Sequence, residues 1–265
     1  MRSDISAVWR RPPADLDRPF NQRLRSGCDR ARSGKPLSVF FRADDIAAPG
    51  SNFNRMMTLF SGYGAPLSLA VVPAWLTSDR WAYLKGFEKR NPRRWCWHQH
   101  GWRHANHEVT GKKQEFGEAR STAQIIRDLT RGKRRLENIM AGAFYPVFTP
   151  PWNRCSARTL QALKKLGYEA VSRSGGGKPP SPAGLPDICV NVDLHTRREK
   201  NPAAGWQNLL GELEQAAATG FCGIMIHHQL MNDAAFDFLE ILLNAFTSHP
   251  GIHLFNFKDM VERFA

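Results

Sequence analysis

Short apolar runs alternate with helical patterns along most of the chain, and this alternation restricts the fold more than any other feature. Buried strands are expected at 37–41, 66–73, 95–98, 144–149, 168–172, 188–192, 222–226 and 252–257. Amphipathic helices are expected between them, at 51–63, 79–90, 121–140, 156–166, 206–218 and 234–247. Regular alternation of strands and helices is typical of a parallel sheet with right-handed crossovers.

No linker interrupts this series, which favours one barrel over two separate domains. The chain has 265 residues, of which 42% are hydrophobic, so a large core is available. We therefore predict an α/β fold, a distorted (β/α)7-type barrel with parallel strands, in a single domain spanning 37–265. Residues 1–36 are rich in Arg, Asp, Pro and Gly, and we expect an irregular N-terminal lead there with one short helix.

Four of the nine histidines lie within residues 95–108. Two of them, His100 and His104, stand four residues apart, a spacing that on a helical turn puts both imidazoles on one face. Asp44 and Asp45 follow the first apolar run and could add a carboxylate. Such a histidine pair can be a surface coincidence, and paired aspartates after a strand often form a cap or turn. Their occurrence together favours a divalent metal site.

Further polar groups follow later apolar runs. His227 and His228 come after the run 222–226, and Asp193 comes after the run 188–192. In barrels and open α/β sheets, functional residues stand at the C-terminal ends of the strands. We therefore expect all of these groups at the same rim.

The motifs are Asp-Asp at 44–45, His-x-x-x-His at 100–104, a proline–aromatic turn at 149–152 and a late strand ending at 227–228. In this order they resemble the NodB-homology polysaccharide deacetylases, which are metal-dependent deacetylases on a distorted (β/α) barrel. The resemblance covers the chain from Leu37 to its C-terminus. It implies a hydrolase of carbohydrate metabolism that removes an acetyl group from an N-acetylated or O-acetylated sugar or glycan. It also implies one divalent metal ion, with zinc as the expected ion.

The resemblance assigns the metal ligands and the base. Asp45, His100 and His104 would bind the ion, and Asp44 would be the general base. Adjacent residues of an extended segment point in opposite directions, so the two carboxylates can take separate roles. A divalent ion held by two imidazoles and one carboxylate keeps a net positive charge and open positions, as amide hydrolysis requires.

The resemblance also assigns the substrate groove and the acid. Pro151 and Trp152 would belong to the third motif, whose aromatic residue lines the groove and whose backbone N–H helps to hold the oxyanion. Asp193 would orient the catalytic histidine. His227 or His228 would be the general acid, and we prefer His228 because it lies farther from the strand.

Three departures from the family pattern indicate a divergent member. The first motif reads Arg42-Ala43-Asp44-Asp45 instead of Thr-Phe-Asp-Asp. Gly101 follows the first histidine, where the family has Ser or Thr. Thr149 stands where the third motif has an arginine that pairs with the base. Arg42, Arg154 and Arg173 are the candidates to replace that arginine.

Two other functions are compatible with the same barrel. One is a metal-dependent amidohydrolase that acts on a non-sugar amide. The other is a catalytically silent barrel that binds an anionic glycan or a nucleic acid through its net charge of +13. Because this charge is spread along the chain without a nucleic-acid motif, we do not expect a nucleic-acid partner for the enzyme.

Cysteine usage and hydropathy suggest the compartment. The five cysteines are scattered without a CxxC pair, which favours free thiols in a reducing compartment. Residues 1–20 hold no apolar segment of the kind found in secretory signals, and no run approaches the ~18 apolar residues of a membrane span. We expect a cytoplasmic protein, and the sequence leaves its oligomeric state open.

Overall fold

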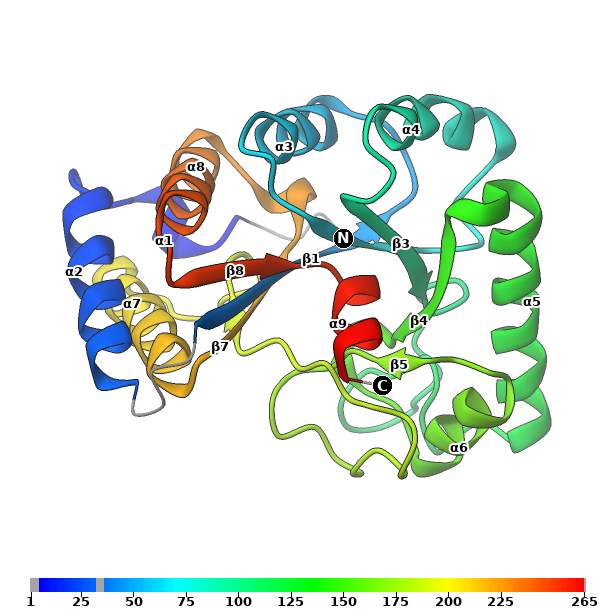
Figure 1. Ribbon diagram of the computed structural model, residues 1–265. Helices are drawn as coiled ribbons and strands as arrows, with labels where there is room; N and C mark the ends of the chain where they lie inside the picture. The colour runs from blue at the N-terminus through cyan, green and yellow to red at the C-terminus, as the bar shows by residue number, and fades with distance from the viewer. Residues whose placement is uncertain (1–4, 32–35, 265) are drawn as a thin grey trace. The chain divides into compact units, whose positions relative to one another are not determined.

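The computed structural model describes residues 5–31 and 36–264, and Figure 1 labels its helices and strands. The described residues form two compact units. The first unit contains the described residues up to Ala43, together with 50–67 and 191–256. The second unit contains 44–49, 68–190 and 257–264. Strand β1 (Leu37–Ile46) contributes to both, because its residues 37–43 belong to the first unit and its residues 44–46 to the second.

The first unit contains a parallel sheet. Its strand order is β6 (Val192–Asp193), β7 (Phe221–Ile226), β1 and β8 (Ile252–Phe255). Residues 39–44 of β1 are all buried, as expected of a parallel strand that is covered on both faces. The helices of this unit are α1 (Ala7–Arg10), α2 (Asp17–Arg30), α3 (Ser51–Gly62), α7 (Pro202–Thr219) and α8 (Asp233–Ser248).

Helix α2 corrects the expectation of an irregular N-terminal lead. Pro19 and Gly27 lower the helix propensity of this segment, but packing against α7 outweighs propensity. The two helices approach so closely that a Cβ atom on Gly27 would lie 2.5 Å from the Glu214 carbonyl oxygen. Arg23 also forms an ion pair of 2.6 Å with Glu214. The domain boundary predicted at residue 37 stays a prediction.

The second unit has its own run of parallel strands. Their order is β5 (Ala170–Val171), β4 (Phe144–Thr149), β3 (Trp95–His100), β2 (Leu67–Val71, in this unit from Ser68) and residues 44–46 of β1. Its helices are α4 (Ser78–Arg90), α5 (Thr122–Met140), α6 (Ala157–Lys165) and α9 (Phe257–Phe264), with short 3₁₀ helices η1 (Ala141–Ala143) and η2 (Pro151–Asn153).

Helix α5 shows how the sequence pattern produces an element. Ser121 accepts a hydrogen bond from the backbone of Gln124, and the Gln124 side chain accepts one from the Ser121 backbone, so a capping box starts the helix. An amphipathic helix was expected here, and its apolar stripe is buried, as is typical of the inner face of such a helix. Its residues are Ile125, Leu129, Leu136 and Met140.

One strand and one helix in the C-terminal third of the chain differ from the expected elements. The strand expected at 188–192 is reduced to β6, and the residues before it form only isolated bridges, such as Ser174 with Val190. Helix α9 was not expected, because it directly follows β8 and is too short for a clear helical period. Its first residue, Phe257, is fully buried. Among the described helices, none is both long and apolar enough to cross a membrane.

Candidate metal centre and active site

The three predicted metal ligands come together in the second unit. Asp45 lies in β1, His100 is the last residue of β3, and His104 lies in the following loop. The Nε2 atoms of both histidines stand 3.3 Å from the Asp45 Oδ1 atom. The ligand atoms of all three residues lie within 4.8 Å of one another.

This arrangement fits a single divalent ion. Ligand atoms at about 2.0–2.1 Å from a tetrahedral zinc ion are separated by roughly 3.3 Å, which matches the 3.3 Å between each Nε2 atom and Asp45 Oδ1. A charge-assisted hydrogen bond would be shorter, at about 2.7–2.9 Å. Two imidazoles and one carboxylate also form a donor set that suits zinc and similar ions.

A tight loop, and not the predicted helical turn, brings His104 to His100. Gly101 has a φ of +59° and His104 a φ of +57°. Both values lie in the left-handed region, so the chain turns back on itself over four residues. Asp45 is also left-handed, with a φ of +61°. The strict alternation of side chains that an extended Asp44-Asp45 pair would show therefore does not apply at Asp45.

Glu115 holds the backbone of this loop. The side chain is fully buried and accepts hydrogen bonds from the backbone N–H groups of Trp102 (3.1 Å), Arg103 (2.7 Å) and His104 (3.2 Å). Burial raises the pKa of the Glu115 carboxyl above its usual range, although these three N–H groups act to lower it. Sequence reasoning missed Glu115, because no spacing rule links it to the histidines.

Gly101 makes room for the Glu115 carboxylate. A Cβ atom at position 101 would lie 2.1 Å from Glu115 Oε2 and 2.6 Å from Pro151 Cγ. The sequence held one sign of this arrangement, because Gly101 stands where the family motif has Ser or Thr.

Thr149 orients His100. The Nδ1 atom of His100 lies 2.9 Å from the Thr149 carbonyl oxygen. A carbonyl oxygen can only accept, so Nδ1 carries the proton and the neutral ring presents the Nε2 lone pair to a metal ion. The Thr149 hydroxyl in turn lies 2.9 Å from Nε2 of His98. The residue that replaces the family arginine is therefore part of the support for a metal ligand.

The predicted base, Asp44, is buried with 3% of its surface exposed. Burial lowers the pKa of His100, but the adjacent Asp45 carboxylate and the charge of Asp44 outweigh this and raise it overall. Burial and the charge of His100 lower the pKa of His104. A metal ion would therefore compete with a proton at His100.

Trp152 lies against the second histidine ligand. It stands in η2 with a φ of +56°, and its ring is 4.5 Å from the His104 ring in an edge-to-face arrangement. The preceding Pro151 is buried. The sequence-based assignment of both residues to a substrate groove stays a prediction.

The three arginine candidates lie in different surroundings. Arg173 is buried, and its Nη2 atom forms an ion pair of 2.6 Å with Asp187. Arg42 is buried in the first unit, with Nη2 at 3.1 Å from the Met225 sulfur. Arg154 is half-buried and forms no ion pair with any residue that the structure describes. The ion pair with Asp187 thus gives Arg173 a partner other than Asp44.

The predicted acid candidates lie in the first unit, after β7. His228 begins a short 3₁₀ helix, η3 (His228–Leu230), and is 6% exposed. Its ring packs edge-to-face at 5.7 Å from Phe53. His227 is half-buried, and its backbone N–H donates to Nδ1 of His195 at 3.1 Å. His227 is therefore the more exposed of the two.

Asp193 stabilises a turn. Its carboxylate accepts hydrogen bonds from the backbone N–H groups of His195 (3.0 Å) and Thr196 (2.9 Å) and from the Thr196 hydroxyl. Among the described residues, none of its hydrogen bonds reaches His227 or His228. Asp193 instead fixes the turn that carries His195, which in turn accepts the N–H of His227.

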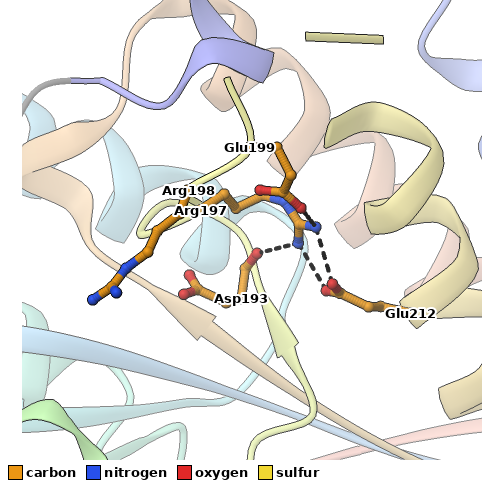
Figure 2. A pocket seen from close by; sticks show the side chains of 5 residues that line it. All are labelled: Asp193, Arg197, Arg198, Glu199 and Glu212. Atoms are coloured by element: carbon orange, nitrogen blue, oxygen red, sulfur yellow. Dashed lines mark hydrogen bonds and ion pairs between the residues drawn. The ribbon is translucent and has the colours of Figure 1, made fainter. Parts of the chain in front are cut away.

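A pocket of about 480 Å³ borders Asp193 in the first unit (Figure 2). Arg197 donates to the Asp193 carbonyl oxygen at 3.0 Å and to Glu212 at 2.8 Å, and it also pairs with Glu199. Only 4% of the Arg197 side chain is exposed. Arg197 thus has a structural role, because its contacts connect the turn at Asp193 to helix α7.

His195 is a buried neutral histidine that the sequence analysis did not assign to the site. It is 1% exposed. Since Nδ1 accepts the N–H of His227, the proton lies on Nε2. Burial, together with the charges of His227 and His228, holds the pKa of His195 well below its ordinary value of 6.5.

We expect the His195→Asn variant to lose part of the pH dependence of stability. The unfolded chain binds a proton at this imidazole below pH 6.5 and the folded protein does not, so its contribution is fully present above pH 6.5 and is lost as the pH falls. As long as the His195 ring of the folded protein stays neutral, its contribution to the free energy of unfolding falls by about 1.4 kcal/mol between pH 7.5 and pH 5.5. Urea unfolding of both proteins at these two pH values, with chelator present, measures it. Parallel losses in both proteins would contradict the assignment.

The family model for polysaccharide deacetylase matches residues 32–171, a little over half of the chain. Among curated protein sequences, none gives a significant match. Several solved structures are similar. An inferred polysaccharide deacetylase from Mycobacterium smegmatis is 15% identical, with 88% of this chain and 91% of that chain covered and a TM-score of 0.66.

Two further structures show the range of these relatives. A family 4 acetyl xylan esterase from Clostridium thermocellum, solved with a cobalt ion, is 12% identical, with coverages of 85% and 91% and a TM-score of 0.55. A CE4-family pseudoenzyme from Bacillus anthracis is 11% identical, with coverages of 85% and 66% and a TM-score of 0.53. At these identities the likeness shows the fold alone. It confirms the predicted fold class, a distorted (β/α)7-type barrel with parallel strands.

Proposed function

The chain belongs to the polysaccharide deacetylase family, and we propose that it is a metal-dependent hydrolase that removes an acetyl group from an N-acetylated or O-acetylated sugar or glycan. The observation that carries this proposal is the placement of both imidazole Nε2 atoms 3.3 Å from one Asp45 oxygen. The similar acetyl xylan esterase was solved with a divalent ion, cobalt. Zinc is the ion we propose here.

In this proposal, Asp45, His100 and His104 hold the ion. Once bound, a divalent ion of this kind polarises a carbonyl group and makes water more acidic. Asp44 accepts the proton of the attacking water. It is suited to this role because it is a buried carboxylate outside the three-residue ligand set. Thr149 and Glu115 keep the two imidazoles in place through the hydrogen bonds described above.

The leaving group must be protonated, and we propose a histidine at the end of β7 for this step. The sequence favours His228, whereas exposure favours His227, because an acid has to reach the leaving group. His228 is 6% exposed and packs against Phe53. We therefore propose His227 as the acid, with Asp193 and His195 as its support, and keep His228 as the alternative.

Alanine variants at these two positions distinguish the assignments. We expect His227→Ala to lower kcat by about 10²–10⁴-fold with the metal retained, as is typical when a general acid is removed. His228→Ala should mainly reduce stability, because it opens a space beside Phe53. Acetate release, metal content and thermal unfolding are measured for both. An inactive His228→Ala beside an active His227→Ala would return the role to His228.

A catalytically silent barrel is the second candidate function. It is favoured by Thr149, which stands in place of the family arginine, and one of the similar structures is a pseudoenzyme. The deciding experiment is acetate release by zinc-loaded protein across acetylated monosaccharides, oligosaccharides and nucleotide sugars, together with acetylated amides that lack a sugar. If the protein binds zinc tightly but releases no acetate from any of these compounds, the silent barrel is favoured. Release from only non-sugar amides would favour the amidohydrolase.

We also propose a cytoplasmic location. All five cysteines are free thiols in the structure, which suits a reducing compartment. Fractionation of cells that produce the protein tests this proposal, and recovery outside the cytoplasm would contradict it.

A further inference from the structure

The loop that follows β3 and carries His104 is called the metal-binding loop. The three tryptophans that are not buried all lie in this loop or contact it. Five of the eight tryptophans are 4% exposed or less: Trp9, Trp81, Trp95, Trp97 and Trp206. The other three are Trp75, Trp102 and Trp152. Trp102 lies in the loop itself and packs on a buried apolar cluster. Trp152 and Trp75 both contact the ring of His104.

Trp75 is the most exposed of the three, at 38% of its surface. Its ring centroid lies 5.8 Å from that of His104, with the two planes tilted by 40°. Trp152 stands 4.5 Å from the same imidazole. One metal ligand thus contacts two indole rings, and one of these presents a substantial apolar surface to solvent.

The turn that carries Trp75 is held by four hydrogen bonds to its backbone. The Trp75 N–H donates to the Val72 carbonyl at 3.1 Å, and the Ala74 N–H donates to the Trp102 carbonyl at 3.0 Å. Arg135 of α5 donates to the carbonyls of Pro73 (2.9 Å) and Leu76 (2.7 Å). The turn is therefore fixed to the metal-binding loop on one side and to α5 on the other.

A fixed and exposed indole has a physical use. Tryptophan offers a large contact area at low conformational cost, and a ring that is already ordered loses little entropy when a partner binds. A tryptophan that served packing alone would be expected to bury its ring, as five of the others do. Fixing a half-exposed ring beside a metal ligand instead favours recognition of an apolar face of the substrate.

We propose that Trp75 is a stacking platform for a sugar ring of the substrate, next to the unit whose acetyl group is removed. This inference rests on the proposed function and deepens it, because a platform of this kind selects an oligosaccharide or polysaccharide over a small acetylated amide. The C–H face of a pyranose ring is the surface that would lie against the indole. Trp75 is thus a specificity-determining residue, outside the metal ligands and the base.

The experiment compares Trp75→Ala and Trp75→Phe with Tyr83→Ala as the matched control. Tyr83 lies on α4 of the same unit and is 47% exposed, so its loss removes a similar exposed aromatic. The probes are N-acetylglucosamine and its β-1,4-linked tetramer, with acetylated xylotetraose as the second glycan. Turnover is measured with zinc-loaded protein, and tetramer binding by calorimetry. Zinc content and thermal unfolding are recorded for every variant.

We expect Trp75→Ala to raise KM or Kd for a tetramer about tenfold or more, as for a well-placed aromatic contact. The kcat, the zinc content and the monosaccharide kinetics should stay unchanged. Trp75→Phe should recover part of the loss, and Tyr83→Ala should resemble the parent. Equal tetramer affinity in Trp75→Ala and the parent would overturn the platform.

The platform and the proposed function can fail separately. If the parent releases acetate and Trp75→Ala does so with the same KM for both tetramers, the platform is wrong and the function stands. If the parent releases no acetate but binds a tetramer that Trp75→Ala binds weakly, the platform stands and the function is wrong. If the parent binds neither tetramer, the platform is overturned whatever the activity.

Discussion

Replacing His100 or His104 by alanine should reduce the affinity for zinc by more than the 10–100-fold typical of outer-shell changes. Each variant leaves only two of the three ligands that lie within 4.8 Å of one another. The fold should survive best in His104→Ala, because this residue is half-buried on a loop, whereas His100 is 1% exposed at the end of β3. Zinc titration against a competing chelator measures the affinity, and circular dichroism measures the fold.

His107→Ala is the matched control for this pair. His107 is an exposed histidine of the same loop region and does not belong to the ligand set. Its zinc affinity should equal that of the parent. Full zinc occupancy in either His100→Ala or His104→Ala would mean that the metal site has been assigned to the wrong residues.

Replacing Asp44 by asparagine should leave zinc bound and lower turnover by about 10²–10⁴-fold, the usual effect of removing a general base. Asparagine has nearly the same shape, so the buried position is filled, but its amide cannot take a proton from water near neutral pH. The measurements are kcat for acetate release and zinc content of the same sample. Asp79→Asn, in the exposed first turn of α4, is the control for a carboxylate change elsewhere in the unit.

The metal content of Asp44→Asn separates three outcomes. Zinc retained with low turnover supports the division of roles between the two aspartates. Loss of zinc would mean that Asp44 is itself a ligand. Retained zinc with unchanged turnover would mean that another group accepts the proton.

Most helices and strands could be predicted from the sequence, because the spacing of apolar residues and the positions of turn residues are local features of the chain. The capping box at Ser121 and the stripe from Ile125 to Met140 are examples, since a helix needs only its own residues to show them. Helix α2 shows the limit. Its stability depends on the contact between Gly27 and α7, and Glu214 of α7 lies far away in the sequence. Such a partner cannot be recognised from local propensity.

The structure brings together the three residues predicted as metal ligands, but their geometry could not be predicted. Residue types and spacing pointed to His100, His104 and one of the two aspartates at 44–45, and the family resemblance selected Asp45. The predicted helical turn between His100 and His104 was wrong. A spacing of four residues is compatible with a helical turn and also with a loop that has two left-handed residues. Glu115 was missed for a related reason, since its role depends on backbone N–H groups that no sequence pattern displays.

Gly101 and Glu115 restrict how this protein can change over time. A serine or threonine at position 101, as in the family motif that this segment resembles, would place its Cβ atom 2.1 Å from the Glu115 carboxylate and 2.6 Å from Pro151. A single substitution to serine or threonine at position 101 would therefore force Glu115 and Pro151 to shift. Loss of Glu115 first would release the loop that carries His104. We therefore expect Gly101 and Glu115 to occur together in proteins that hold this loop through the same glutamate.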